Sequence, residues 1–555
     1  MTRCGYFFIL KSMQKVLTAE EMREVDRLTT EKYGIPSMIL MENAAHAAAR
    51  AITEKLGGSV AGKTFLILCG KGNNGGDGAA LARILWTQGA NVGIRLIGKI
   101  NETKGDAKQN FEILRLLDGS LNADFRRLDF CEIGEEENLD NYISFNKKYD
   151  NVIVDALFGT GLTRPILEGL LSKIIHDISN SCSNHKVGKI AVVSIDLPSG
   201  LNADLREQIG ENVCADLTVT FTAPKLANVL PPASNFSGEL VVANIGSPQE
   251  LIDNLPSKLF LIEKEDARKW LENTKFKDDS YKNKRGHALL IVGSKEYTGA
   301  AVLAANAAML SGVGLTTVAT GESAQTAIAA KVLEEVITRS LPETESGAIS
   351  DKAFQEIDKL IEKVDVVGIG CGLSSVEKTG KDFVREVVEK RKTPVVIDAD
   401  GLNALSPFDL QGSEEFPLIL TPHEGEFLRL LGTKDKEVVK DRVKAVRDFA
   451  EKHAVILVLK GERVLIGAPD GRVVINPTGN SGLGKAGNGD TLTGIIAGFI
   501  AQAVQMNVGI FETVVAAVYI SGLAGDIAAE KFGKRMMLAS DVRECLSEAF
   551  QKIEN

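Results

Sequence analysis

Short apolar runs alternate with helical segments along most of the chain. FLILC (65–69), VIVDAL (152–157) and LTVTF (217–221) are each bounded by turn residues, as expected of strands buried on both faces. Helical segments separate these runs, so that successive strands can lie parallel with helices on both faces of the sheet. The pattern therefore predicts an α/β fold.

The N-terminal region begins with a well-marked helix. Thr18 and Glu21 have the spacing of a capping box, and Gly34 is placed to end the helix. The elements predicted after it are a helix (37–55), a strand (65–69), a glycine-rich loop (70–78), a helix (79–88) and a further strand at AVVSIDLPSG (191–200).

A domain boundary is expected between residues 255 and 264, because Pro248 and Pro256 interrupt the pattern and IEKEDARKWL starts a new helix. We therefore predict one domain over 13–255 and a second over 264–555. The strands predicted for the second domain are ALLIVG (288–293), VDVVGIG (364–370), PVVIDAD (394–400), PLILTP (417–422) and AVILVLKG (454–461). Asp470-Gly471 lies between two apolar runs and predicts a two-residue hairpin, hence an antiparallel pair in this half.

Composition and charge narrow the class of protein. Hydrophobic residues make up 44% and charged residues 25%, which are ordinary values for a globular chain. The formal charge of −10 argues against a non-specific grip on nucleic acid. The seven cysteines form no Cys-x-x-Cys pair, so we expect neither a disulfide framework nor a zinc site, and a cytoplasmic location.

No targeting or membrane segment is expected. The apolar run at 6–10 is shorter than a secretory signal needs, so residues 1–12 are expected to be an extension before the first domain. We find no run of about 18 apolar residues, and therefore predict no membrane-spanning helix.

The most informative stretch of the second half is NSGLGKAGNGDTLTGIIAG (480–498). Its five glycines between Gly482 and Gly494 let backbone approach a ligand, and an apolar helix is expected to begin at Asp490. A helix N-terminus after glycines binds anions, and a carboxylate there is placed to take a proton from an attacking hydroxyl. Asp490 could equally be a helix N-cap, which Asp favours, and spacing alone leaves both roles open.

This half resembles the ribokinase-like family of α/β domains, in which Gly-x-Gly-Asp opens an apolar helix near the C-terminus. Four further motifs resemble one branch of that family, the nucleotide-dependent NAD(P)H-hydrate dehydratases. They are YTGAAVLAANAAMLSGVGL (297–315), GIGCGLS (368–374), TPHEGEF (421–427) and LKG (459–461). The resemblance covers nearly all of residues 264–555.

The resemblance implies a role for individual residues. Asp490 is expected to be the catalytic base at a hydroxyl on the hydrated nicotinamide ring. The positions implied to bind this substrate are Ala301, Gly372, His423 and Asp490. The positions implied to bind ADP are Lys460, Gly461, Glu462, Arg463, Val464 and Gly489. Phosphorylation of the hydroxyl, with ADP as co-substrate and Mg²⁺ as metal, would create a leaving group whose elimination restores the dihydropyridine.

Two positions depart from the family pattern. Asn488 stands where members usually carry Thr or Ser, and Glu424 stands where they usually carry Pro. The backbone donors and Asp490 remain, although the carboxylate of Glu424 could change the affinity for metal or phosphate. From the residues alone, His423 could instead be a loop histidine with a structural hydrogen bond, and Lys460 a surface lysine at a strand end.

In the first half, the loop Gly72–Gly78 follows a strand and opens a helix, so its amides could cradle phosphate. It lacks the Gly-x-Gly-x-x-Gly spacing, and no acidic residue ends a second strand about 20 residues on, so a redox dinucleotide fold is poorly supported. Asp155 and Asp196 both lie at strand ends, which meet at one crevice in an open parallel sheet. Asn74, Asp155 and Ser199 could therefore jointly offer oxygens to a cation. A plain glycine turn and capping roles for the two aspartates are the alternatives.

Residues 13–250 resemble the NAD(P)H-hydrate epimerase family, which implies a Rossmann-like three-layer domain with a mostly parallel sheet. Asn74, Asp155 and Ser199 then match K⁺ ligands, and Asp196 is a candidate for acid–base catalysis at the hydroxylated carbon. The implied substrate-binding positions are Asn73, Asn74, Gly75, Gly76, Asp77, Gly159, Thr160, Gly161, Leu162, Thr163, Arg164, Pro165 and Asp196.

Both halves thus point to one damaged cofactor. The dehydratase would take the S hydrate, and the epimerase would convert the R hydrate into it. We expect NAD(P)H hydrates and ADP as small-molecule partners, no nucleic acid or membrane partner, and a homo-oligomer; the residues do not decide between ADP and ATP, and the resemblance favours ADP. The alternatives are a ribokinase-like small-molecule kinase fused to a nucleotide-binding module, and a non-enzymatic nucleotide sensor in the first half.

Overall fold

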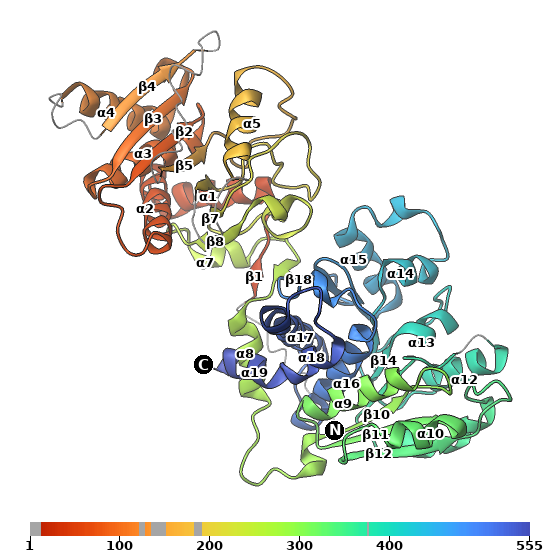
Figure 1. Cartoon of the computed structure of the whole chain (residues 1–555). Helices are drawn as coiled ribbons and strands as arrows, with labels where there is room; N and C mark the ends of the chain where they lie inside the picture. Colours follow the sequence, from red (N-terminus) through yellow and green to blue (C-terminus); the bar gives the residue numbers. More distant parts are fainter. Residues whose placement is uncertain (1–12, 121–127, 135–150, 183–190, 375–376, 555) are drawn as a thin grey trace. The chain divides into compact units, whose positions relative to one another are not determined.

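The computed structural model describes residues 13–120, 128–134, 151–182, 191–374 and 377–554 (Figure 1). The extension expected at residues 1–12 lies outside this range. The chain divides into two compact units, Lys15–Ser257 and Lys258–Asn555, the second of which also includes Met13 and Gln14.

The N-terminal unit is built on a parallel sheet, whose order is β4-β3-β2-β5-β6-β7-β8 among the residues described. Its strands are β2 (Thr64–Cys69), β3 (Asn91–Ile97), β4 (Leu128–Ile133), β5 (Asn151–Ala156), β6 (Val192–Ile195), β7 (Leu217–Phe221) and β8 (Glu239–Ala243). The chain runs outward from β2 through β3 to β4, and then returns to continue from β5 on the other side. The strand order therefore reverses between β2 and β5, where open α/β sheets bind their ligands.

The helices of this unit are α1 (Ala19–Tyr33), α2 (Ser37–Lys55), α3 (Asn73–Thr87), α4 (Gly105–Ser120), α5 (Leu170–Cys182), α6 (Leu226–Val229) and α7 (Gln249–Asp253). The predicted capping box of α1 is confirmed, because Thr18 and Glu21 each accept a hydrogen bond from the other's backbone N–H. Gly34 ends the helix in the left-handed conformation, with φ of 67°.

The glycine-rich loop of this unit is shorter than the sequence predicts, because α3 already begins at Asn73. Several of the predicted loop glycines lie in the helix at points of close packing. A Cβ on Gly76 would lie 2.8 Å from Ala107, and one on Gly78 would lie 2.6 Å from the Cβ of Ala156. These glycines therefore let α3 approach its neighbours, and the free loop is only Gly70–Gly72.

The C-terminal unit has an eleven-stranded sheet among the residues described, in the order β1-β9-β18-β17-β16-β15-β14-β13-β10-β11-β12. Its strands are β1 (Gln14–Lys15), β9 (Leu259–Leu261), β10 (His287–Ile291), β11 (Leu315–Gly321), β12 (Val336–Leu341), β13 (Val366–Ile369), β14 (Val395–Ile397), β15 (Leu418–Leu420), β16 (Ile456–Leu459), β17 (Val464–Gly467) and β18 (Val473–Asn476). From β15 to β12 all neighbours pair in parallel, and the order reverses between β10 and β13.

The antiparallel element predicted for this half is confirmed, since β17 pairs antiparallel with both β16 and β18. The predicted turn length is wrong by one residue. Ala468 N donates to Arg472 O at 2.9 Å, so the turn between β17 and β18 holds three residues, with φ of 86° at Gly471.

The helices of the C-terminal unit are α8 (Lys264–Asn273), α9 (Thr298–Leu310), α10 (Glu322–Ala329), α11 (Phe354–Ile361), α12 (Lys378–Glu389), α13 (Ala399–Ala404), α14 (Glu424–Leu430), α15 (Arg442–His453), α16 (Asn488–Met506), α17 (Ile510–Phe532), α18 (Ala539–Glu544) and α19 (Leu546–Glu554). Small residues allow α16 to pack closely on α9, where a Cβ on Gly494 would collide with the backbone of Ala304. Within the described residues, α17 is the one helix that is long and apolar enough to cross a membrane by length and composition alone. Since 78% of its apolar window is buried in the unit, it has the burial of a core helix.

The predicted α/β fold class is confirmed: the N-terminal unit is built on a parallel sheet, and the C-terminal unit on a mostly parallel sheet with an antiparallel element. Strands β3, β4, β11 and β12 are absent from the predicted runs. They lie at or next to sheet edges, and β3 and β12 carry partly exposed positions that interrupt the apolar pattern.

Candidate active sites

The C-terminal site is organised by the N-terminus of α16. Gly487 caps this helix with φ of 92°, a conformation in which glycine avoids the strain of a side chain. Asn488 and Gly489 form the first turn with Asp490, so their backbone N–H groups lack acceptors within the helix. The turn can therefore receive an anion, and the helix begins two residues before the predicted Asp490.

A buried ion pair lies beside this turn. Lys460 Nζ donates to Asp398 Oδ1 at 2.8 Å, and Thr493 Oγ1 donates to Asp398 Oδ2 at 2.9 Å. Glu426 Oε2 lies 3.9 Å from the same ammonium group. A Cβ on Gly489 would lie 3.4 Å from both Lys460 Nζ and Asp398 Oδ2, so the helix turn contacts the pair directly.

The ion pair keeps both of its groups charged. Burial alone would raise the pKa of Asp398, but the nearby Lys460 outweighs it and holds this pKa below its usual value. Burial likewise pulls the pKa of Lys460 down, and the carboxylates of Asp398 and Glu426 raise it above its usual value. A lysine at this position can therefore offer a full positive charge to a phosphate.

Asp490 has the electrostatics of a base that works near neutral pH. Burial raises its pKa to about 6, and the negative charges of Asp398 and Asp400 act in the same direction, whereas Cys371 and Lys460 oppose it. A carboxyl group with such a pKa is deprotonated at neutral pH and is more basic than an ordinary aspartate. The alternative of a plain N-cap does not hold, because Gly487 is the N-cap of α16 and Asp490 is the third residue of the helix.

The implied substrate positions of this unit fall into two groups. Gly372 follows β13 with φ of 67°, where a Cβ would lie 2.8 Å from the Cβ of Tyr297, so the loops after β10 and β13 meet at the point where the strand order reverses. Ala301 is fully buried, and its side chain packs against Gly293 at the end of β10. It supports the loop rather than offering a side chain to a ligand.

His423 has the structural hydrogen bond that the sequence left open. It caps α14, and its Nδ1 accepts from Gly425 N at 3.0 Å and Glu426 N at 3.3 Å. The acceptor role of Nδ1 leaves the proton of a neutral ring on Nε2, where an exposed side chain can still donate to a ligand. Glu424 is the first residue of the same helix.

The implied nucleotide positions 460–464 form the connection between β16 and β17. A Cβ on Gly461 would lie 2.5 Å from the Arg442 guanidinium, and Arg463 donates to Pro477 O. Val464 begins β17 and Glu462 is exposed. Of this group, the Lys460 side chain is the one held beside the α16 turn.

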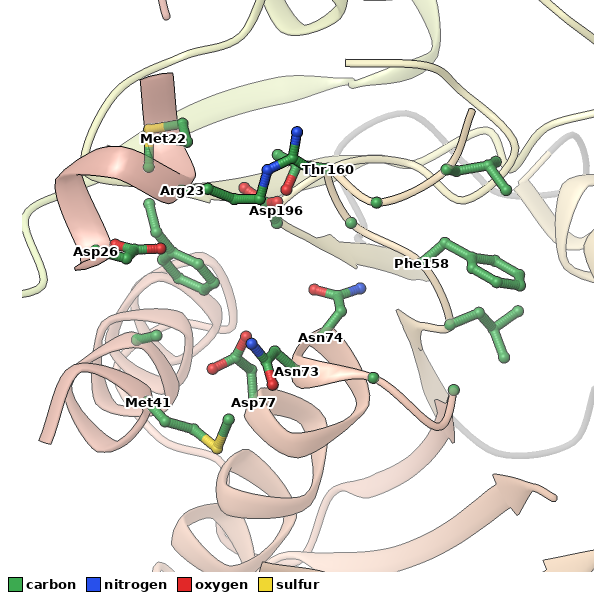
Figure 2. Close-up of a pocket in the computed structure, with 18 of the residues that line it drawn as sticks. Met22, Arg23, Asp26, Met41, Asn73, Asn74, Asp77, Phe158, Thr160 and Asp196 are labelled. Carbon is green, nitrogen blue, oxygen red and sulfur yellow. The ribbon is translucent and has the colours of Figure 1, made fainter. Parts of the chain in front are cut away.

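The N-terminal unit has a cavity of about 590 Å³ at the reversal between β2 and β5 (Figure 2). The residues that line it come mainly from α1, α2, the start of α3, and the loops after β2, β5, β6 and β7. Among the predicted residues, those that line it are Asn73, Asn74, Asp77, Gly159, Thr160, Gly161, Leu162 and Asp196. Gly75 and Gly76 are buried in α3, and Thr163, Arg164 and Pro165 are not part of the lining.

Asp196 is held at the cavity by a buried lysine. Lys225 Nζ, which is 1% exposed, donates to Asp196 Oδ1 at 2.6 Å and to Thr220 Oγ1 at 2.9 Å. Asp196 itself has φ of 66°, and Asn228 Nδ2 donates to its carbonyl oxygen at 3.3 Å. A non-glycine residue in this strained conformation, with its carboxylate fixed by a charged partner, is typical of a functional site.

The three candidate cation ligands lie at the adjoining strand ends. Asp155 is fully buried and accepts from Ser194 Oγ at 2.8 Å and from Ser199 Oγ and N. Phe158 N donates to Ser199 Oγ at 2.9 Å. Asn74 lies on the other side of this loop, with its Oδ1 3.4 Å from the Cβ position of Gly159, and its buried amide atoms have no partner within the described residues.

The sequence analysis misses several site residues. Lys225 directly follows the loop after LTVTF, and Asp398 lies inside PVVIDAD, so polar residues at strand ends are the signal for both. Asp26 on α1 also lines the cavity, and neither its spacing nor its helix indicates this. Only the packing of α1 beside the strand ends brings it there.

Both units are α/β domains, and each brings a lysine and aspartates together at the ends of parallel strands. A family model described as NAD(P)H-hydrate dehydratase matches residues 288–548, and one described as YjeF-related protein N-terminus matches residues 37–227. The chain is 38% identical over 545 residues to the bifunctional NAD(P)H-hydrate repair enzyme Nnr of Moorella thermoacetica, covering 97% of each chain. It belongs to the family of bifunctional NAD(P)H-hydrate repair enzymes.

Other relatives agree with this membership. The enzyme of the same name from Thermofilum pendens is 35% identical over 540 residues, again with 97% of each chain covered. A solved structure, the ADP/ATP-dependent NAD(P)H-hydrate dehydratase of Bacillus subtilis co-crystallised with ATP and Mg²⁺, is 31% identical; the match covers 53% of this chain and 98% of that one, with a TM-score of 0.46. The family membership favours a hydrate dehydratase over the small-molecule kinase that the sequence left open.

Proposed function

We propose that this chain repairs hydrated NADH and NADPH, with a dehydratase site in the C-terminal unit and an epimerase site in the N-terminal unit. The observation that carries the proposal is the α16 turn, where free amides, a charged lysine and a carboxyl of raised pKa lie together. Such a set can hold a phosphate and deprotonate a hydroxyl beside it.

In the dehydratase site, Asp490 takes the proton of the ring hydroxyl while that oxygen attacks the terminal phosphate of the nucleotide. The amides of Asn488 and Gly489 and the Lys460 ammonium group stabilise the negative charge on the moving phosphoryl group. The phosphorylated oxygen then leaves with its bonding electrons, and loss of a ring proton restores the dihydropyridine.

We propose ADP as the phosphoryl donor, with AMP and phosphate as products. The described residues include no cluster of three or more His, Cys, Asp or Glu that could hold a metal ion. Mg²⁺ often binds through substrate phosphates and only one or two carboxylates. We therefore propose that Mg²⁺ enters with the nucleotide, that Gly372 and His423 lie along the substrate, and that Ala301 supports the loop beside it from within the core.

In the epimerase site, we propose Asp196 as the base that exchanges a proton with the hydroxyl on the inverting carbon. The Lys225 ammonium group 2.6 Å away fixes its orientation and balances its charge. The cavity-lining residues Asn73, Asn74, Asp77 and Gly159 to Leu162 would surround the hydrate.

We propose K⁺ as the cation held by Asn74, Asp155 and Ser199. The unpartnered amide of Asn74, across the Phe158–Gly159 backbone from the Ser199 hydroxyl, supports the fit of an oxygen-ligated cation. Asp155 would supply the negative charge. Bound there, K⁺ would add positive charge under the loop that borders the cavity.

We further propose that the activities divide as residues 13–255 and 264–555, that the protein acts in the cytoplasm, and that it forms a homo-oligomer. The division is supported by the compact units Lys15–Ser257 and Lys258–Asn555.

The direct test is absorbance at 340 nm with purified protein, NADH hydrate and Mg²⁺, in the presence of either ADP or ATP. We expect NADH to appear with stoichiometric AMP and phosphate when ADP is supplied. A stable phosphorylated product without NADH would contradict the dehydratase and favour a kinase.

A further inference from the structure

The cavity of the N-terminal unit contains more carboxyl groups than one base requires. Asp26 from α1, Asp77 from α3 and Asp196 after β6 reach it from three different elements (Figure 2). Lys225 is the buried cation among them, and its ion pair is with Asp196. The other titratable or charged residues of the lining are Arg23 on α1, Lys71 before α3 and Asp106 on α4.

Lys225 is the one buried cation of the lining and pairs with Asp196, so neither Asp26 nor Asp77 has a buried cation as its partner among the lining residues. Burial raises the pKa of Asp77 well above its usual value, and the charges of Asp196 and Asp26 add to this effect. Burial therefore favours the neutral form of Asp77, whereas Asp196 forms a salt bridge with Lys225.

Asp26 faces the cavity and its carboxyl group has no hydrogen-bond or ion-pair partner among the residues described. The surrounding protein desolvates it and raises its pKa to about 6, with Lys225 opposing the rise and Asp196 adding to it. A carboxyl group with this pKa can give and take a proton near neutral pH.

The chemistry of epimerisation requires such a group. The inverting carbon of the hydrate bears both the hydroxyl and the ring nitrogen, so its configuration is lost when either bond breaks. In one route the hydroxyl gains a proton and the C–O electrons leave with water; in the other the hydroxyl loses a proton and the C–N electrons move to nitrogen, which gains one. Reversal on the other face returns every proton and electron, and both routes need one acid and one base.

We propose that Asp26 is the second proton-transfer group of the epimerase site, giving in its protonated form the proton that complements the one taken by Asp196. This role rests on the proposed epimerase function. The proposed catalytic carboxyl therefore comes from helix α1, whereas the other candidate residues of this site lie in the glycine-rich segment or at strand ends.

The test compares Asp26→Asn, Asp26→Glu and a matched control, Glu24→Gln, which alters a carboxyl on the same helix that pairs with Arg27 instead of lining the cavity. Exchange between the two hydrate epimers is followed at several pH values in the full chain, after subtraction of the spontaneous rate. Circular dichroism and thermal unfolding of each variant report whether the N-terminal unit is folded, and the dehydratase rate on the S hydrate in the same samples is the activity control for the C-terminal unit.

For Asp26→Asn we expect kcat for epimer exchange to fall about 10²-fold or more with little change in KM, as for loss of a general acid. The wild-type decline in rate as pH rises through about 6 should disappear, and Asp26→Glu should restore part of the rate. Glu24→Gln and the dehydratase activity should be unchanged.

An unchanged kcat and pH profile in Asp26→Asn would overturn the proposal, as would a loss confined to KM, or a wild-type rate that increases through pH 6. If the wild-type chain does not exceed the spontaneous rate, the proposed epimerase function itself fails, and that result is separate from the others.

Discussion

At the scale of single residues, each proposed site depends on one carboxylate whose surroundings set its charge. Asp490 and Asp196 both lie beside a lysine, yet the contacts differ. Lys225 binds Asp196 directly, whereas Lys460 binds Asp398 and leaves Asp490 beside it with a raised pKa. The second arrangement suits a base that must hold a proton only transiently.

Replacing Asp490 with Asn should lower kcat for dehydration by about 10²–10⁴-fold, because the base is lost while the amides of the α16 turn remain. Nucleotide binding, measured by calorimetry, should change little. In the wild-type enzyme the ionised form is active, so dehydration should decline as pH falls through about 6. A rate that persists to pH 4 would contradict the raised pKa.

Replacing Lys460 with Met should weaken nucleotide binding and destabilise the C-terminal unit. The change leaves Asp398, which is 2% exposed, without its cation, and removing one partner of a buried pair typically costs about 3–5 kcal/mol of unfolding free energy. Denaturant unfolding measures the loss. The double variant Lys460→Met/Asp398→Asn should regain part of the stability but none of the affinity; equal stability of the single variant and wild type would show that the pair is unimportant.

At the scale of helices and strands, local sequence explains where elements begin but not what they contact. The capping box at Thr18 and the apolar runs of the central strands mark those elements in advance, because caps and full burial leave clear patterns. Edge strands are partly exposed and lose that pattern. Asn74 lies in a glycine-rich segment and Asp196 follows a strand, so local motifs mark both of them. Asp26 reaches the site only because α1 packs there, and no local sequence pattern encodes that packing.

The substitution Gly487→Ala tests whether the α16 turn requires the left-handed backbone conformation of Gly487. In Gly487→Ala, a Cβ at φ of 92° would lie 2.6 Å from Leu303 Cδ1, and a left-handed alanine costs about 1–2 kcal/mol. We expect a lower melting temperature and slower dehydration. The control Gly299→Ala, which has no atom within 4 Å and lies in α9, should leave the melting temperature almost unchanged; equal effects would contradict the requirement.

Exchanging K⁺ for a bulky organic cation should slow epimer exchange and leave dehydration unaffected, because the candidate ligands lie at strand ends of the N-terminal unit alone. Ser199→Ala should reduce the K⁺ dependence. An epimer-exchange rate that does not depend on K⁺ would contradict the proposed K⁺ site.

At the scale of the whole molecule, two compact units carry complementary proposed activities on one substrate. Their separation at Ser257 and Lys258 predicts that each unit, expressed alone, keeps its own activity. A mixture of the two should then convert both epimers to NADH. Loss of either activity on separation, measured against the intact chain, would show that the units depend on each other.

The central claim is that one chain repairs both epimers, and the 340 nm progress curve of an R and S NADH-hydrate mixture with ADP and Mg²⁺ tests it most directly. The wild-type chain should convert both epimers at enzymatic rates, Asp196→Ala should convert the S fraction rapidly and then continue at the spontaneous rate, and Asp490→Asn should yield almost no NADH. Complete rapid conversion by Asp196→Ala would contradict the account.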